Sequence, residues 1–176
     1  MSSQLRVDKI LPVDGAPTGG GGGVIQVKSV IKTDTFTTDS TSYTDVTGLS
    51  VSITPKFNTS KILVMMHVQM GHTNYVSGFL RLVRDSTAIA VGTDTSSRHA
   101  CTVCMSDDPT DDELNSLSMT FLDSPSTTSA TTYKVQIITE GTGNTGNVYI
   151  NRSGEDSDNV QHGRPVSTLT LMEVSA

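Results

Sequence analysis

Residues 61–70 read KILVMMHVQM, and this stretch decides the fold class. Successive side chains of a strand point to opposite faces of a sheet, so one face here is apolar throughout. The other face begins with Leu63 and Met65 and then turns polar. Apolar side chains on both faces predict a central strand that is covered on both sides and ends at Gly71. The continuous apolar face consists of Ile62, Val64, Met66, Val68 and Met70.

Shorter stretches with the same alternation follow one another along the rest of the chain. About eight strands, spaced roughly 10 to 20 residues apart, are typical of an all-β sandwich or barrel. Residues 33–47 are expected to be part strand and part loop, whereas residues 96–112 follow no clear pattern. No segment has the periodicity of a long amphipathic helix. The expected strands are 24–32, 48–55, 61–70, 76–84, 87–91, 114–122, 133–137, 148–151 and 167–174.

The position of the last strand narrows the fold class. STLTLMEV (167–174) ends just before the C-terminus, which indicates that the first and last strands of the domain pair with each other. Jelly rolls with eight strands have this property. We therefore predict an all-β, jelly-roll-like antiparallel sandwich. An immunoglobulin-like sandwich is disfavoured because the chain has no Trp for a Cys…Trp…Cys core.

Five consecutive glycines divide the chain into an extended arm (1–18), a tether (19–23) and a β-sandwich head (24–176). Polyglycine is too flexible to sit inside a helix or strand, and five residues reach at most about 17 Å. Pro12 and Pro17 exclude a long helix in the arm. Two interpretations stay open: a disordered leader, or a docking peptide that adds to a neighbouring protein. The docking side chains would be Leu5, Val7, Ile10, Leu11 and Val13.

Composition disfavours several classes of function. The net charge is −6 and Lys and Arg do not cluster, so a nucleic-acid partner is not expected. No apolar run has the length of a membrane span, and the N-terminus lacks the apolar core of a secretory signal, so we expect synthesis in a cytosol. Aromatic residues make up only 5% of the chain, too few for an extended sugar- or base-stacking platform.

The segment His99-Ala-Cys-Thr-Val-Cys104 is the strongest candidate for a metal site. A CxxC pair with a nearby imidazole could supply three zinc ligands, but a structural zinc site needs four. In an ideal strand Cys101 and Cys104 point to opposite faces, which argues against both a shared metal and a disulfide. Free thiols are therefore expected. The remaining histidines, His67, His72 and His162, are too scattered to assign to a site.

Two acidic segments offer oxygen ligands for a hard cation such as Ca²⁺. One is Gly154–Asp158, and neither segment has the spacing of an EF-hand loop. We expect both to be solvated loops without a metal. Because no nucleophile elbow or phosphate-binding loop is present, we also expect a protein that is not an enzyme and binds no cofactor. The first segment contains Asp107, Asp108, Asp111, Asp112 and Glu113.

Three segments together resemble short tail-fibre or fibre-like virion proteins of tailed phages, especially phages of marine bacteria and cyanobacteria. They are LRVDKILPVDGAPTGGGG, VTGLSVSITPKFNTSKILVMMHV and TYKVQI…YINR…STLTLMEV. Residues 93–112 lie outside the resemblance. The family implies a trimeric β-rich head whose N-terminal part attaches to other virion proteins, placed on the virion surface. It implies no catalytic residues.

Two roles are compatible with this resemblance: a tail-fibre-like head that contacts the host surface, and a capsid decoration protein that clamps shell subunits. The short tether favours a compact knob over a long fibre. Trimer contacts are expected near Leu63 and Met65. A trimer would also protect sheet edges that a monomer exposes. In the first role, a host receptor or glycan would meet the tip loops 140–147 and 154–161. The loop residues concerned are Asn144, Thr145, Asn147, Asp156, Asp158 and Asn159.

Overall fold

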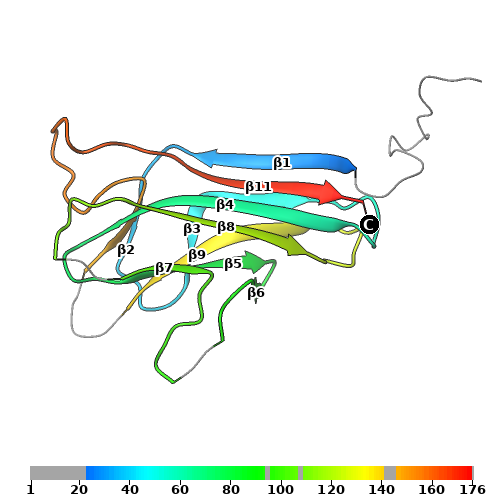
Figure 1. The fold of residues 1–176 in the computed structure, drawn as a ribbon, viewed down its shortest axis with the longest axis horizontal. Helices are drawn as coiled ribbons and strands as arrows, with labels where there is room; N and C mark the ends of the chain where they lie inside the picture. The colour runs from blue at the N-terminus through cyan, green and yellow to red at the C-terminus, as the bar shows by residue number, and fades with distance from the viewer. Residues whose placement is uncertain (1–22, 94–95, 107–108, 141–145, 176) are drawn as a thin grey trace, which may run out of the picture.

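The computed structural model describes residues 23–93, 96–106, 109–140 and 146–175. These residues form strands and connecting loops but no helix, and two antiparallel sheets pack face to face (Figure 1). None of the described residues forms a helix long and apolar enough to cross a membrane. The arm residues and the first four tether glycines lie outside the described residues.

The first sheet is built around β4 (Lys61–His72), which has β11 on one side and β8 on the other. Beyond β11 lies β1, which forms an edge. The last residues of β4 pair with the short β10, which in turn pairs with β2. The other strands of this sheet are β1 (Val24–Lys32), β2 (Phe36–Thr38), β8 (Asn115–Asp123), β10 (Val148–Ile150) and β11 (Ser167–Val174).

The second sheet has the order β3, β9, β5, and two short strands share the free edge of β5. β6 pairs with the end of β5 and β7 with its beginning, both opposite β9. The strands are β3 (Thr44–Ile53), β5 (Gly78–Arg84), β6 (Thr87–Ile89), β7 (Val103–Met105) and β9 (Thr131–Thr139).

The strand pairs are nested along the chain. β1 pairs with β11, β3 with β9, β4 with β8, and β5 with β6 and β7. The β2–β10 pair lies in the same sheet as β1 and β11, and the pairs that follow alternate between the two sheets, so one long antiparallel double strand wraps around the core. This is the connectivity of a jelly roll with two Greek keys. The predicted fold class and the predicted pairing of first and last strands are both confirmed.

The central position predicted for β4 is confirmed, and its continuous apolar face, from Ile62 to Met70, is buried in the core. Two other expectations for this strand were wrong. The strand continues through Gly71 to His72, because Gly71 pairs with Tyr149 and lies so close to the Arg152 carbonyl that no side chain would fit. Its second face is not fully covered within one chain, since Leu63 and Met65 are half-buried and His67 is exposed.

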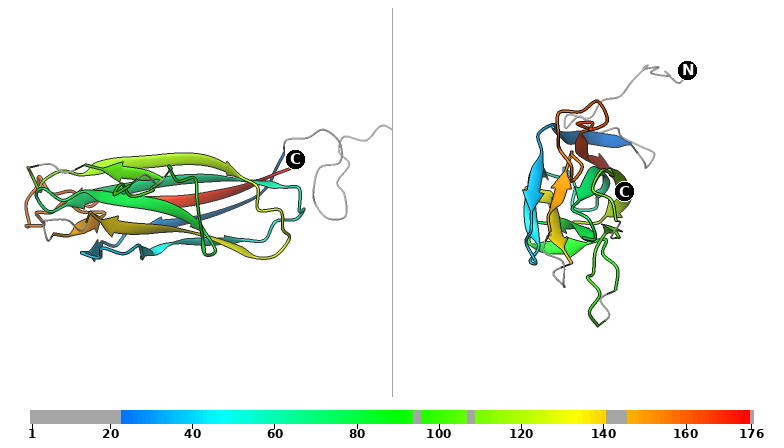
Figure 2. Two further views of the ribbon diagram at one scale, coloured as in Figure 1. Left: turned by 90° about the horizontal axis from the view of Figure 1, so that it is seen from below. Right: turned by 90° about the vertical axis from the view of Figure 1, so that its left-hand side faces the viewer.

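The two ends of the sandwich differ in character, as Figures 1 and 2 show. At one end, named here the entry pole, Gly23 and Ser175 exchange two hydrogen bonds of 3.1 Å. The connection 54–60 lies beside them. The opposite end, the distal pole, carries residues 73–77, 109–114 and 151–166. The chain therefore enters and leaves the head at one pole, and the long connection 151–166 lies at the other.

A buried carboxylate fixes the entry pole. Glu173 of β11 is fully buried, and its carboxylate accepts hydrogen bonds from Gln26 Nε2 at 2.6 Å and from the Lys56 backbone N–H at 2.7 Å. Burial acts to raise the pKa of Glu173, but the hydrogen bonds outweigh burial and hold that pKa below its ordinary value of 4.5. Glu173 thus ties together β1, β11 and the connection 54–60.

We expect Glu173→Gln to destabilise the head by about 1.5–3 kcal/mol at neutral pH, the contribution of a buried hydrogen bond to a charged group. Because the folded pKa lies below 4.5, this contribution is present above pH 4.5 and is lost as pH falls through the folded value. Urea unfolding at neutral and at acidic pH measures it. The exposed Glu113→Gln is the control, and an equal loss at both pH values would contradict the assignment.

Candidate functional site

The distal pole begins where β10 leaves the core at Asn151. This residue is buried and has a positive φ of 63°. Its side-chain amide donates to the carbonyls of Lys32 and Asp34, both at 2.9 Å, and its Oδ1 accepts from the Ser167 hydroxyl at 2.6 Å. Asn151 therefore fixes both ends of the long connection 151–166 against the edge of the first sheet.

Two arginines and one carboxylate give this connection its shape. Arg152 lies over the ring of Tyr149, with 4.1 Å between the guanidinium carbon and the ring centroid. Asp156 forms ion pairs with Arg152 at 3.1 Å and with Arg164 at 2.5 Å. The carboxylate of Asp156, a predicted receptor residue, is thus engaged within its own loop.

The structure brings together the two acidic segments that the sequence analysis considered separately. The Glu155 backbone N–H donates to the Asp111 carbonyl at 3.0 Å. As a result, ligand atoms of Asp112, Glu155 and His162 lie within 4.8 Å of one another. Sequence distance conceals this cluster, because Asp112 precedes β8 whereas Glu155 and His162 precede β11. Because β8 and β11 both pair antiparallel with β4, the segments that precede them lie at the same end of the sheet. This pairing is the signal that could have revealed the cluster.

Of the other predicted recognition residues, the structure describes Asn147, Asp158 and Asn159, which belong to the connections at this pole. The backbone of Asn147 forms two hydrogen bonds with Thr73. The Thr73 N–H donates to the Asn147 carbonyl at 2.9 Å, and the Asn147 N–H donates to the Thr73 hydroxyl at 3.1 Å. Asp158 and Asn159 are exposed, and Asn159 also caps a turn by accepting from the Gln161 backbone N–H. Asn144 and Thr145 lie outside the described residues, as do the arm residues and Asp107 and Asp108.

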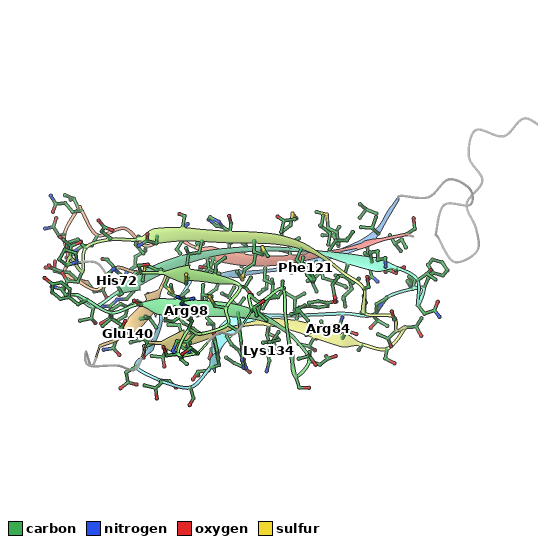
Figure 3. The ribbon with its side chains drawn as sticks, turned by 60° about the horizontal axis from the view of Figure 1, so that its bottom comes forward. His72, Arg84, Arg98, Phe121, Lys134 and Glu140 are labelled. Carbon is green, nitrogen blue, oxygen red and sulfur yellow. The ribbon has the colours of Figure 1, made fainter. Side chains whose placement is uncertain are left out.

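The loop between β6 and β7 borders two adjoining hollows at the second sheet, which sequence reasoning did not anticipate. Their volumes are about 430 and 390 Å³, and both are lined by Ser97, Arg98 and His99. The Tyr43 hydroxyl donates to the Ala100 carbonyl at 2.8 Å and ties the loop to the sheet. In Figure 3, Arg98 and Glu140 lie in the same half of the head as His72. The larger hollow is also lined by Phe79, Cys101, Cys104 and Glu140.

The prediction that Cys101 and Cys104 point to opposite faces was wrong. Both side chains line the larger hollow and interact with each other. Strand alternation does not apply, because Cys101 lies in the loop and only Cys104 belongs to β7. Burial, with a contribution from Cys104, raises the pKa of the Cys101 thiol to about 11. Both cysteines are free, and the His99 ring contacts the ring of Phe79, with 4.9 Å between the ring centroids.

No family model matches the chain, and no curated protein matches it significantly. Among solved structures, the chain is similar to a chain in the structure of the infectious bursal disease virus Gx strain, with a TM-score of 0.41 and 14% sequence identity. The similarity covers 97% of this chain, which spans 43% of the length of that chain. A likeness at this level carries no information about function.

The two thiols should differ in reactivity. A rise in pKa from 9.0 to about 11 lowers the thiolate fraction of Cys101 about 100-fold at a given pH below 9. Cys104 is exposed, so we expect iodoacetamide at mildly alkaline pH to alkylate Cys104 well before Cys101. Peptide mass spectrometry over time measures both rates. Faster labelling of Cys101 would contradict the described burial.

Proposed function

We propose that this protein is a non-enzymatic surface component of a phage virion: a trimeric, tail-fibre-like head. The N-terminal arm attaches it to other virion proteins, and the distal pole contacts the host surface. The observation that carries this proposal is the separation of the two poles. Gly23, where the arm and tether join the head, lies at the entry pole, and residues 109–114 and 151–166 lie at the other end. The resemblance of both ends of the sequence to fibre-like phage proteins supports it.

The outer face of the first sheet supports the trimeric part of the proposal. Val27, Met172, Leu63 and Leu122 occupy directly paired positions on four adjacent strands. Val27 is 50% exposed and Leu122 is 55% exposed. This apolar row lies toward the entry pole, with Met65 in the next row, and we propose that it packs against a second copy of the chain.

The same face turns polar toward the distal pole. The row opposite His67 contains Ser118 and Thr168, and Ser116 donates to Gln69 at 2.9 Å. A contact between copies would therefore be centred near the entry pole and leave the distal loops accessible. This arrangement suits a knob whose copies are gathered at their attachment point.

Capsid decoration is the alternative that uses the same features. There the arm would lie along the shell, and the apolar row would pack on shell subunits or on neighbouring copies. The short tether, about 17 Å at full extension, favours a head held close to its support in either role. Copy number per particle separates them, because a decoration protein covers the whole shell and a tail component does not.

Deletion of residues 1–18 tests the attachment. β1 starts at Val24 and forms its full pairing with β11, so the shortened chain should fold. We expect an unchanged circular dichroism spectrum and a melting temperature within a few degrees of the full chain. Mixed with particles that lack the protein, it should fail to bind. Undiminished binding of the shortened head would refute attachment through the arm.

Leu122→Glu tests the trimer. Leu122 lies at the β8 end of the apolar row, and a charge there should be costly to bury between two copies, so the protein should become monomeric. Light scattering at micromolar concentration measures the mass. Ser50→Glu is the matched control, because Ser50 is exposed on the second sheet and pairs with Lys134. A wild-type chain that is monomeric, or a Leu122→Glu variant that stays trimeric, would overturn the proposed interface.

A further inference from the structure

We propose that Asp112, Glu155 and His162 form a binding site for a divalent transition-metal ion such as Zn²⁺ or Mn²⁺ at the distal pole. Each residue offers one ligand atom, and these atoms lie within 4.8 Å of one another. Two carboxylates and one imidazole suit a borderline or hard divalent ion. Their combined charge of about −2 balances such an ion when the imidazole is neutral. This inference is independent of the virion role.

The His162 side chain is the observation that points to a ligand. It is only 8% exposed, although it belongs to a surface loop. Its Nδ1 lies 3.2 Å from the Ser157 carbonyl, which can only accept, and 3.1 Å from the Ser157 hydroxyl. That hydroxyl donates its proton to Glu155 Oε1 at 3.2 Å, and in this arrangement Nδ1 of His162 carries the ring proton. Nε2 is then a lone-pair donor, and it forms no hydrogen bond with any described residue. A ring nitrogen bound to a backbone carbonyl, with the other nitrogen free, is the usual arrangement of a metal-binding histidine.

The distances inside the cluster suit an ion better than a direct contact. Nε2 of His162 lies 4.0 Å from Oδ1 of Asp112, which is too long for a hydrogen bond. Two ligand atoms about 2.1 Å from one tetrahedral ion lie about 3.4 Å apart. A small rotation of the exposed Asp112 side chain would bring the pair to this spacing, and the Glu155 carboxylate would complete a three-residue set with open positions for water.

The carboxylates of the cluster have no cationic side chain of their own. Both Arg152 and Arg164 pair with Asp156. Within the described ranges, neither Asp112 nor Glu155 forms an ion pair with a Lys or Arg. The approach of the two loops is nevertheless fixed by the hydrogen bond from Glu155 to Asp111 and by Gly154, where a side chain would collide with Asp111. This backbone arrangement holds the carboxylates of Asp112 and Glu155 near each other, and a bound cation would offset the repulsion between their negative charges.

Thermal unfolding of the full chain, stripped with a chelator and then titrated with Zn²⁺ or Mn²⁺, tests the site. At an ion concentration of 100 times Kd we expect the melting temperature to rise by roughly 5–10 °C for a chain of this size. His162→Gln and Asp112→Asn should each abolish the rise. Asp158→Asn, an exposed acid of the same loop outside the cluster, should retain it.

A second measurement separates binding from stability. Free Mn²⁺ is counted by electron paramagnetic resonance, and we expect one bound ion per chain in the wild type and none in Asp112→Asn. Because Asp112 is 64% exposed, this variant should fold normally. A Cys101→Ser/Cys104→Ser chain should keep the Zn²⁺ effect. The proposal is overturned if neither ion binds, or if binding survives Asp112→Asn and His162→Gln but is lost with the cysteines.

Discussion

The antiparallel pairing of β1 with β11 is the constraint on which the rest of the structure depends. It joins residues 24–32 to residues 167–174 and closes the first sheet beside β4. Once the ends of the head are paired, the strands between them fold back in nested pairs. The β2–β10 pair stays in the first sheet, and the pairs that follow alternate between the two sheets. The two poles follow from this. Both ends of the head meet where Glu173 holds Gln26 and Lys56, and the long connections emerge at the far end.

Much of the fold could be predicted from the sequence, because alternation of apolar and polar side chains reports directly which face of a strand is buried. The stretches around β3, β4 and β11 carry this signal clearly, whereas β1 leaves Val27 and Ile31 exposed. Prediction failed where a tertiary contact decided the local structure. Gly71 continues β4 because Tyr149 pairs with it, and Cys101 turns toward Cys104 because the β6–β7 loop does not follow a strand.

The distal site could be predicted only in part. The sequence indicated two acidic segments and an unassigned His162, but not that the three would meet, because their proximity is a property of the topology. Asp156 illustrates the opposite error: an acid that looks available in the sequence is engaged by two arginines. The hollows beside the β6–β7 loop draw on residues from several strands and on Arg98, whereas the sequence indicated only that His99, Cys101 and Cys104 were a candidate metal site.

Together these features describe a head with two different ends. The entry pole combines a buried carboxylate clamp with an apolar row on the adjacent face, and the distal pole combines polar loops, a carboxylate–imidazole cluster and nearby hollows. The most direct test is cryo-electron microscopy of the intact particle. Our account predicts density for the jelly roll with Gly23 and Ser175 facing the particle and residues 151–166 facing outward. A head in the reverse orientation, or one lying with its distal loops buried against the shell, would contradict it.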